Sequence, residues 1–342
     1  MVPTIYDIAR VAKVSKSTVS RVLNNQKNIS EEARQSVLNA IEELNYHPSK
    51  IAKSLSKGYD AILVISRSTK TIANNPFFSE ILYSISKKAE EENFDVILQT
   101  SQNSEDELKK CMNKIKEKMI KGIIMLTSPA NEELFQQLDP FNIPVVVIGK
   151  VEGDYTNIFC VDTNNYQDSY DLTQYLIDQG HKEIACLHSP FDYNVAIDRF
   201  EGYINCMRDN QITPNKEWVL DSGYTVEEAY HSAKSLLLLS DRPTAIFATD
   251  DLKVMSIYKA FSEERVRIPT DVSLVGYSNT NLSQFLSPSL TSIEIPVKML
   301  GDTGTQLLFS KIKHKSKTSI SKIVIPTEKI IRDSVATIPN NH

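Results

Sequence analysis

The sequence predicts two structural parts, a small all-helical module at the N-terminus and an α/β body behind it. Three observations support this prediction. The chain has 342 residues, more than one hydrophobic core usually organises. Residues 1–58 carry apolar side chains at helical spacing, whereas short β-branched runs alternate with amphipathic stretches from Tyr59 onward. The first 58 residues also hold nine Lys or Arg against five Asp or Glu, and this net +4 leaves −9 on the remainder of a chain whose total is −5.

Composition and targeting signals exclude several classes of protein. No apolar run approaches the roughly 20 residues of a membrane helix, and the first residues do not show a charged stretch followed by an apolar one. The four cysteines lack the spacing of a disulfide pair or a metal site: Cys111, Cys160, Cys186 and Cys206. We therefore expect a cytoplasmic protein with reduced thiols, no metal, no cofactor and no membrane contact. A basic module on an acidic body suits phosphate binding at one end.

The N-terminal module is predicted to be three short helices around one core. Thr4 and Asp7 form a variant of the capping box, and Ser15 and Ser30 are good N-caps for the second and third helices. Helical spacing turns one set of side chains inward: Ile5, Ile8, Ala9, Ala12, Val19, Val22, Leu23, Ala33, Val37, Leu38, Ile41 and Leu44. The exposed face of the second helix then offers cations and short hydroxyl side chains, which suit base edges and phosphates in a major groove: Lys16, Ser17, Thr18, Ser20 and Arg21.

The string TIYDIARVAKVSKSTVSRVLNN, followed by ISEEARQSVLNAIEELNYHPSKIAKSL, closely resembles the DNA-binding headpiece of the lactose/galactose repressor (LacI/GalR) family. The resemblance implies a helix-turn-helix over about residues 4–23 within a domain of residues 1–48, and two copies that bind a near-palindromic operator. It assigns base reading to Lys16, Ser17 and Arg21. Contacts to the DNA backbone fall to Thr4, Tyr6, Ser15, Thr18, Ser20 and Asn24.

Residues 49–58 resemble the hinge helix of the same family. A helix this short is marginal alone, so we expect it to order on DNA and within a dimer. Leu55 matches the leucine that pries apart a base step from the minor groove, although an ordinary contact between domains is the alternative interpretation.

Residues 59–342 are predicted to form two doubly wound α/β lobes. Near-continuous apolar strands covered on both faces are typical of parallel sheets, and they are expected at AILVIS, DVILQ, GIIMLT, PVVVIG, EIACLH, TAIFAT and VSLVGY. The intervening helices include FFSEILYSISKKAEEEN and TVEEAYHSAKSLLLL. The region resembles periplasmic sugar-binding proteins, which implies an N-lobe of about residues 59–161 and 294–322 and a C-lobe of about residues 162–293 and 323–335.

Ligands of such sheets bind beyond the carboxyl ends of the strands, so the residues that follow each strand are the site candidates. Arg199, in RFEGY, matches the family's effector-binding arginine, whose planar fork can hold two sugar hydroxyls. The full set of predicted effector-binding residues is Phe77, Phe78, Tyr193, Arg199, Tyr224, Thr249 and Asn279. Other interpretations remain: Phe78 could pack in the core, and Asp250 is suited to cap its own helix.

The resemblance implies a homodimeric transcription repressor that a small sugar releases from its operator. The family commonly has Asp after Gly-Tyr at one strand end, but GYSNT places Ser278 there, which argues against simple galactoside or purine recognition. General similarity to Gram-positive regulators favours maltose or a related α-glucoside. The alternative is a regulator whose DNA binding is strengthened by a corepressor or a phosphoprotein partner. An enzyme is not expected, because no Walker A, GxGxxG, GxSxG or HExxH motif occurs. A plain solute-binding protein would have no use for a DNA headpiece.

Overall fold

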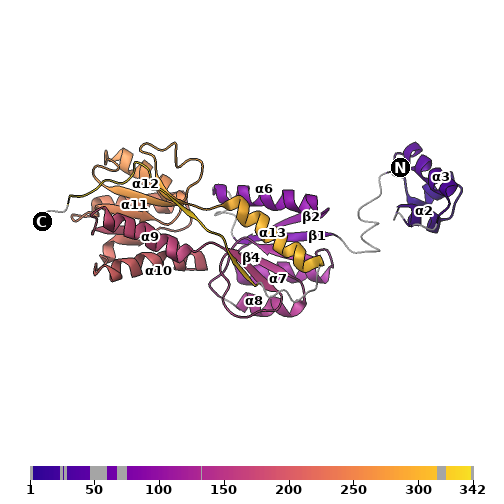
Figure 1. The fold of residues 1–342 in the computed structure, drawn as a ribbon, viewed down its shortest axis with the longest axis horizontal. Coiled ribbons are helices and arrows are strands. Elements are labelled where there is room, and N and C mark those ends of the chain that lie inside the picture. Colours follow the sequence, from indigo (N-terminus) through magenta and orange to yellow (C-terminus); the bar gives the residue numbers. More distant parts are fainter. Residues whose placement is uncertain are drawn as a thin grey trace. The chain divides into compact units, whose positions relative to one another are not determined.

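The computed structural model divides the chain into two compact units, residues 1–59 and 60–342 (Figure 1). It describes residues 3–23, 26, 29–46, 60–67, 75–131, 133–313 and 321–339. The predicted hinge segment at 49–58 therefore lies outside the described residues, together with Asn24 and Leu55. Within the described ranges, no helix is both long enough and apolar enough to cross a membrane.

The first unit is a three-helix headpiece, as the capping signals predict. Its helices are α1 (Ile5–Val11), α2 (Lys16–Leu23) and α3 (Glu31–Glu43). At the start of α1, the Asp7 carboxylate accepts hydrogen bonds from the Thr4 amide (2.9 Å) and hydroxyl (2.7 Å). The Ser15 hydroxyl accepts from the Thr18 amide at 3.1 Å, and Ser30 caps α3. Their shared core consists of Ile8, Val19, Val22, Val37, Ala40 and Tyr46.

The prediction that Leu38 turns inward is wrong. Its side chain is 47% exposed, whereas Val37 and Ala40 are buried against α1 and α2. Successive residues of a helix are separated by about 100°, so a stripe centred on Val37 and Ala40 leaves Leu38 facing outward. A run of two adjacent apolar residues does not by itself say which of them faces the core.

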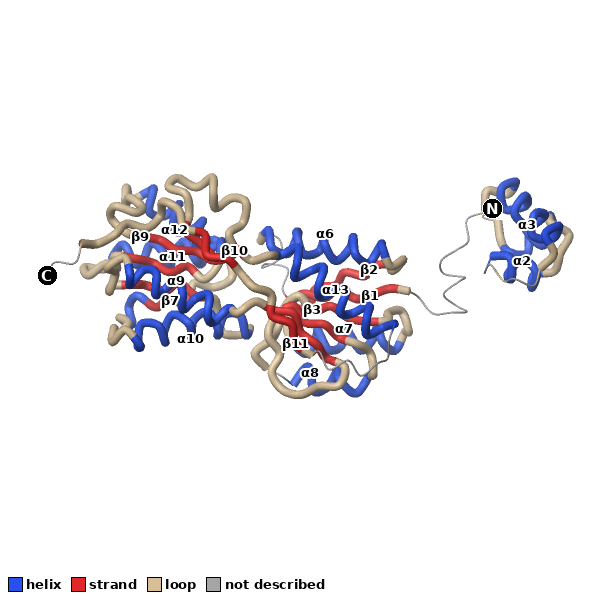
Figure 2. Tube along the Cα trace, in the orientation of Figure 1, coloured by secondary structure: helices blue, strands red, loops and turns tan. Residues whose placement is uncertain are grey.

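The body contains two six-stranded sheets among its described residues (Figure 2). The first has the order β11-β5-β4-β3-β1-β2 and is parallel throughout; the second has the order β12-β10-β9-β8-β6-β7, with β12 alone antiparallel. The strands are β1 (Ala61–Arg67), β2 (Asp95–Ser101), β3 (Gly122–Met125), β4 (Val145–Ile148), β5 (Ile158–Asp162), β6 (Ile184–His188), β7 (Val219–Asp221), β8 (Ala245–Ala248), β9 (Ser273–Ser278), β10 (Thr291–Glu294), β11 (Lys322–Val324) and β12 (Glu328–Ile330). This arrangement confirms the predicted fold class.

Helices cover both faces of each sheet, which explains why the strands are apolar without alternation. In β1, Ile62 and Val64 pack into one cluster, while Leu63 and Ile65 pack into the cluster on the opposite face. The helices of the first lobe are α6 (Pro76–Glu91), α7 (Ser104–Lys116), α8 (Glu133–Leu138) and α13 (Val297–Lys313), and those of the second lobe are α9 (Asn165–Asp178), α10 (Asn194–Asp209), α11 (Val226–Leu238) and α12 (Asp251–Glu263).

The chain passes between the two sheets three times, from β5 to α9, from β10 to α13 and from β11 to β12. The last passage comes later than predicted. Lys322–Val324 pair with Cys160–Asp162 of the first sheet, so the switch to the second lobe follows Val324 and not Lys322. The sequence did not single out the strands β5, β7, β10, β11 and β12. The strands β3, β4 and β8 have only four residues each, but they lie within longer apolar runs and were predicted.

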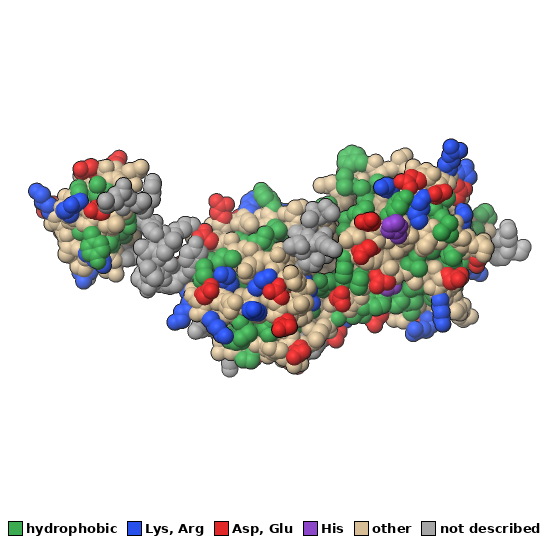
Figure 3. All heavy atoms as spheres, turned by 180° about the vertical axis from the view of Figure 1, so that it is seen from behind, with side chains coloured by type: hydrophobic (Ala, Val, Ile, Leu, Met, Phe, Trp, Pro, Cys, Tyr) green, Lys and Arg blue, Asp and Glu red, His purple; other side chains and the backbone are tan. Residues whose placement is uncertain are grey.

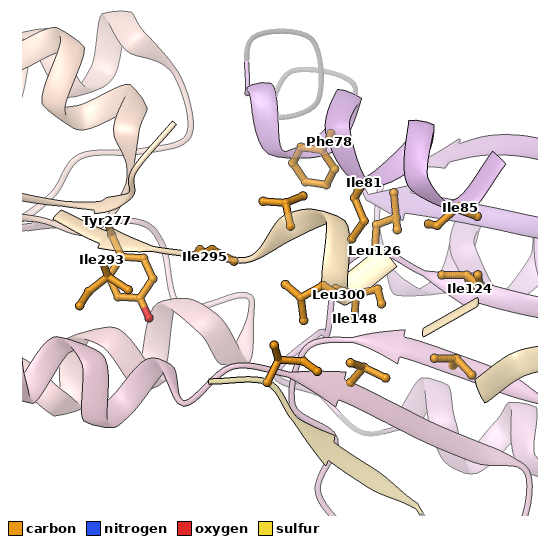
Figure 4. Close-up of a cluster of buried hydrophobic side chains, with 14 of the residues drawn as sticks. Phe78, Ile81, Ile85, Ile124, Leu126, Ile148, Tyr277, Ile293, Ile295 and Leu300 are labelled. Atoms are coloured by element: carbon orange, nitrogen blue, oxygen red, sulfur yellow. The ribbon is translucent and has the colours of Figure 1, made fainter. Parts of the chain in front are cut away.

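The buried cluster on the inner face continues through one of these passages. Figure 4 shows Ile293 and Tyr277 in the second lobe, Ile295 on the connecting segment, and Leu300 and Phe78 in the first lobe. All five side chains are at most 8% exposed. The connection between the lobes therefore borders a packed apolar core. A ligand bound next to this core would contact both lobes.

Helices α9 and α10 pack unusually closely at Gly202. A Cβ atom added there would lie 2.3 Å from the Tyr166 carbonyl oxygen and 2.9 Å from the Ser169 Cβ. We expect Gly202→Ala to lower the free energy of unfolding by about 1 to 2 kcal/mol, because overpacking outweighs the gain in helix propensity. Urea unfolding measures this change. Arg208→Ala, at an exposed position of the same helix, should change stability by less than about 0.5 kcal/mol. A Gly202→Ala variant as stable as the wild type would contradict the close contact.

Candidate functional site

Five of the ten side chains that the sequence assigns to DNA lie on α2, and two of these, Thr18 and Ser20, are half-buried. Lys16, Ser17 and Arg21 are exposed, as are Ser15 at the start of the helix and Thr4 and Tyr6 at α1. The Ser15 hydroxyl lies 2.7 Å from the Ser17 hydroxyl and 2.9 Å from the Thr18 hydroxyl, so these short side chains form one hydrogen-bonded group.

Lys16 is held close to Tyr6 in the free headpiece. Its ammonium donates to the Tyr6 hydroxyl at 2.9 Å and lies 4.5 Å from the centre of the ring. The hydrogen bond from Lys16, supported by its charge, lowers the pKa of the exposed Tyr6 phenol. This contact joins α1 to α2 at the surface and restricts the side chain predicted to read a base.

In the body, one pocket gathers six of the seven predicted effector-binding residues. Its lining includes Phe77 and Phe78 from α6, Tyr193 and Arg199 from the start of α10, and Tyr224 and Thr249 from the second lobe. The empty space, counted to the open mouth, is about 1050 Å³. Phe78 is also buried in the core, so the same side chain both packs in the core and lines the pocket.

Arg199 is fixed by contacts on three sides. Its Nε donates to the Asn165 Oδ1 at 2.9 Å, its Nη1 donates to the Thr249 carbonyl at 2.6 Å, and its guanidinium lies 3.7 Å from the centre of the Tyr277 ring. The Tyr277 hydroxyl in turn donates to Asp168 at 2.6 Å. A planar fork held in this way presents its remaining edge in one orientation.

Asp162, at the end of β5, is coupled to Arg199 through Asn165. Its Oδ1 accepts from the Thr163 amide at 2.8 Å and from the Asn165 amide group at 3.1 Å. Burial raises the pKa of the Asp162 carboxyl to about 6, and the nearby Asp198 adds to this effect. Sequence reasoning missed Asp162 and Asn165, because the segment before them was not predicted as a strand and served only to mark the division between lobes.

The first lobe contributes Arg67, another residue that sequence reasoning missed. It ends β1 and lines the same pocket, so the rule that residues at strand ends form the site could have identified it. Its guanidinium lies 5.7 Å from the centre of the Tyr193 ring, which belongs to the second lobe. Burial is the main reason that the pKa of Tyr193 rises to about 12.

Asn279 does not belong to this lining. Its amide nitrogen donates to Glu294 at 3.1 Å and its oxygen accepts from Arg332 at 2.7 Å, so its side chain is engaged within the second lobe. Ser278 lines the pocket in its place. Asp250 caps α12 as expected, since its side chain accepts from the Lys253 amide, and it also reaches the pocket.

A helix-turn-helix headpiece joined to two α/β lobes with a pocket between them defines a ligand-binding transcriptional regulator. Comparisons with known proteins agree. Residues 4–49 match the model of "Bacterial regulatory proteins, lacI family", and residues 173–335 match that of "Periplasmic binding protein-like domain". Two curated relatives bear the name HTH-type transcriptional repressor PurR: that of Mannheimia succiniciproducens is 31% identical, with 98% of this chain and 99% of the relative covered, and that of Vibrio vulnificus is 32% identical with the same coverage.

Solved structures show the same architecture. The lac repressor dimer bound to operator and the anti-inducer ONPF superposes with a TM-score of 0.85 at 22% identity, covering 98% of this chain and all of that one. The complex of transcriptional regulator CelR with cellobiose gives a TM-score of 0.73 at 25% identity, covering 97% and 99%. The chain belongs to the lacI family of bacterial regulatory proteins and is a DNA-binding transcriptional repressor, not an enzyme.

Burial of Asp162 predicts a pH-dependent stability. Its pKa in the folded protein, about 6, lies above the ordinary value of 3.8, so folding favours the protonated form. The stability that the protonated Asp162 carboxyl contributes is fully present below about pH 4 and is lost as the pH rises through about 6. As the pH rises from 4 to 7, the free energy of unfolding of the wild type should therefore fall by about 2 to 3 kcal/mol more than that of Asp162→Asn. Urea unfolding measures this difference.

Asp271 supplies a control of opposite sign for this pH series. A hydrogen bond from Arg267 lowers its pKa to about 2, so its contribution is lost as the pH falls, and Asp271→Asn should remove stability at neutral pH. Identical pH profiles for Asp162→Asn and the wild type would show that Asp162 is not perturbed by burial.

The exposed face of α2 predicts a specific effect of Arg21. We expect Arg21→Ala to weaken binding to an operator selected from random DNA by about 1 to 3 kcal/mol at fixed salt, because a contact to a base edge is lost. Gel-shift titration measures this. Arg10→Ala is the charge-matched control, since the Arg10 guanidinium is paired with Asp7 on α1 at 3.0 Å and its loss should matter less. Equal effects of the two substitutions would argue that Arg21 supplies only charge.

Proposed function

We propose that this repressor is released from its operator when a small sugar binds the pocket between the two lobes. The observation that carries the proposal is the fixed Arg199 guanidinium at the pocket surface, next to Asp162, Asn165 and Thr249. A rigid donor fork beside a carboxylate and a hydroxyl suits vicinal hydroxyl groups, which both donate and accept hydrogen bonds.

Aromatic side chains support a sugar as the ligand. Tyr193 and Tyr224 lie with their ring centres 5.8 Å apart in an edge-to-face pair, and Phe77 and Phe78 face the pocket from the other lobe. Ring faces of this kind pack well against the apolar faces of pyranoses. Cellobiose is the ligand in the CelR complex named above. The relatives named above give no support for maltose in particular, so the proposal extends to neutral sugars in general.

Residues of both lobes line the pocket, so a bound ligand would affect the angle between them. The lobes already touch beside the pocket, where the Asn194 side chain donates to the Ser128 hydroxyl at 3.1 Å and to the Lys150 carbonyl at 3.1 Å. A ligand shifts such an arrangement only through different affinities for its two states. A coupling free energy of about 1 to 3 kcal/mol would change operator affinity about 5- to 150-fold.

The repressor is proposed to act in the cytoplasm as a homodimer, with segment 49–58 between headpiece and body as the proposed hinge. The lac repressor structure named above, which has the same architecture, is a dimer, and this supports self-association. Acidic and basic side chains are interspersed over the face of the body in Figure 3, which does not favour wide adhesion to polyanions.

Operator release by sugars tests the proposal through Arg199. A panel of maltose, cellobiose, trehalose, sucrose, galactosides and phosphorylated sugars is titrated into the complex of the full chain with its selected operator. We expect one sugar to release the wild type, and Arg199→Ala to stay bound at that concentration, because loss of charged hydrogen bonds weakens sugar binding at least about tenfold. Arg208→Ala, exposed on the same helix, should respond like the wild type.

The direction in which a ligand changes operator affinity distinguishes release by a sugar from the alternative mechanisms. If a ligand strengthens operator binding, the protein is a corepressor-dependent regulator that uses the same pocket. If no small molecule changes operator affinity, release by a sugar is wrong, and a phosphoprotein partner becomes the leading explanation.

A further inference from the structure

We propose that the buried Asp168 carboxylate holds the three passages between the lobes in one arrangement, and that Asp168 is thereby a positioning residue for operator binding by the ligand-free repressor. Asp168 lies in the first turn of α9, directly after the first passage, and the sequence did not single it out. The inference rests on the proposed function in one respect, since it takes the arrangement of the lobes to govern operator affinity.

Two hydroxyl groups from distant parts of the chain meet at this carboxylate. Tyr277 in β9 donates to the Asp168 Oδ2 at 2.6 Å, and Thr327 donates to the Oδ1 at 2.5 Å. Asp168 is 7% exposed and Tyr277 is fully buried. Arg199 favours the charged form of the carboxylate through its own charge. Each oxygen of the buried carboxylate therefore has its own hydroxyl donor.

These three residues lie at the three passages of the chain between the lobes. Helix α9, which carries Asp168, follows the first passage. Tyr277 pairs in register with Ile293 of β10, which leads into the second passage. Thr327 lies within the third, between β11 and β12. The carboxylate thus connects segments that are 109 and 159 residues away from it in the sequence.

The same carboxylate is connected to the pocket through Tyr277. The Arg199 guanidinium lies 3.7 Å from the centre of the Tyr277 ring and lines the pocket, so a shift of this ring would displace a pocket side chain. Close-packed interiors change between discrete arrangements and do not deform continuously. The two hydrogen bonds to Asp168 therefore stabilise one arrangement of the lobes relative to others.

The Asp168 carboxylate depends on its two donors because it is buried. Burial raises the pKa of the Asp168 carboxyl, and the hydrogen bonds from Thr327 and Tyr277 oppose that rise. Hydrogen bonds to a charged group are stronger than those between neutral groups, and a buried polar atom that loses its partner is costly. Loss of the Thr327 hydroxyl should therefore weaken the connection between α9 and the third passage.

A weaker connection lowers operator affinity through the population of lobe arrangements. When the third passage is held less firmly, a larger fraction of the free protein adopts arrangements other than the one that binds DNA. The apparent affinity falls with the fraction of molecules in the binding-competent arrangement.

The test compares variants of the full chain on its selected operator in the absence of sugar. Thr327→Val removes the hydroxyl and keeps the shape of the side chain, Thr327→Ser keeps the hydroxyl, and Asp168→Asn removes the charge. Thr173→Val is the matched control, because the buried Thr173 hydroxyl donates to the Ser169 carbonyl at 2.8 Å within α9 itself. Circular dichroism verifies that each variant folds.

Two measurements are made on each variant. Gel-shift titration at fixed salt gives the operator affinity. Hydrogen exchange followed by mass spectrometry reports on the third passage, where the Ile325 amide donates to the Asp162 carbonyl at 2.7 Å.

We expect Thr327→Val to weaken operator binding about three- to tenfold, and to speed exchange in the segment that contains the Ile325 amide at least about threefold. Thr327→Ser and Thr173→Val should both stay within about twofold of the wild type. Asp168→Asn should also weaken binding, and adding Thr327→Val to it should cost less than the two separate effects combined, because both act on one hydrogen bond. If Asp168→Asn does not fold, the two Thr327 variants still decide the question.

Three outcomes would overturn the proposal. The first is a Thr327→Val variant that binds operator as tightly as the wild type. The second is an equal loss of affinity in Thr173→Val, because the effect would then reflect only the stability of α9. The third is a Thr327→Ser variant as weak as Thr327→Val, because the methyl group and not the hydroxyl would then be required.

Release by a sugar is judged separately, through the titration of Arg199→Ala. A sugar that releases the wild type, combined with normal operator binding by Thr327→Val, would refute the role of Asp168 and leave the proposed function in place. Weak operator binding by Thr327→Val, combined with no response to any sugar, would support the role of Asp168 and refute release by a sugar.

Discussion

Parallel strands end at the same edge of a sheet, and the pocket depends on this constraint. Residues at or just after the carboxyl ends of seven strands line it, from both sheets: Arg67, Leu126, Gly149, Asp162, Ser189, Thr249 and Ser278. Because the chain passes three times between the sheets, these two edges open onto one space. The long apolar strands beneath them fix the positions of side chains that are far apart in sequence.

Two buried charged groups near this edge are held in ion pairs. Glu107 is fully buried, and burial raises its pKa while the Arg67 charge and hydrogen bond oppose that rise. Lys253 is likewise 2% exposed and donates to Asp250 and to the Ser189 hydroxyl. Removing one member of such a pair leaves a buried charge without compensation, which typically costs several kcal/mol.

The headpiece and the body differ in how their binding surfaces are built. The headpiece buries a core of six residues and exposes α2, so its surface chemistry is local and can be assigned from one helix. The body exposes little of its site and assembles it from distant segments. Arg199 illustrates this difference, since its orientation is set by Asn165, by the Thr249 carbonyl and by the Tyr277 ring, which is itself anchored by Asp168. A ligand that contacts Arg199 thereby reaches the segment that connects the lobes.

The sequence by itself determined the headpiece helices, their caps, the long strands and the general place of the pocket, because capping and periodicity are local and strand ends follow from them. It could not decide between adjacent apolar residues such as Val37 and Leu38, and it did not recognise the strands β5, β7, β10, β11 and β12. Arg67 could have been identified as a residue at a strand end, but its ion pair with Glu107, 40 residues away, could not. Asn279 was assigned to a pocket that it does not line, because Glu294 and Arg332 engage its side chain. Only the tertiary structure decides such partnerships, since they depend on which segments packing brings together.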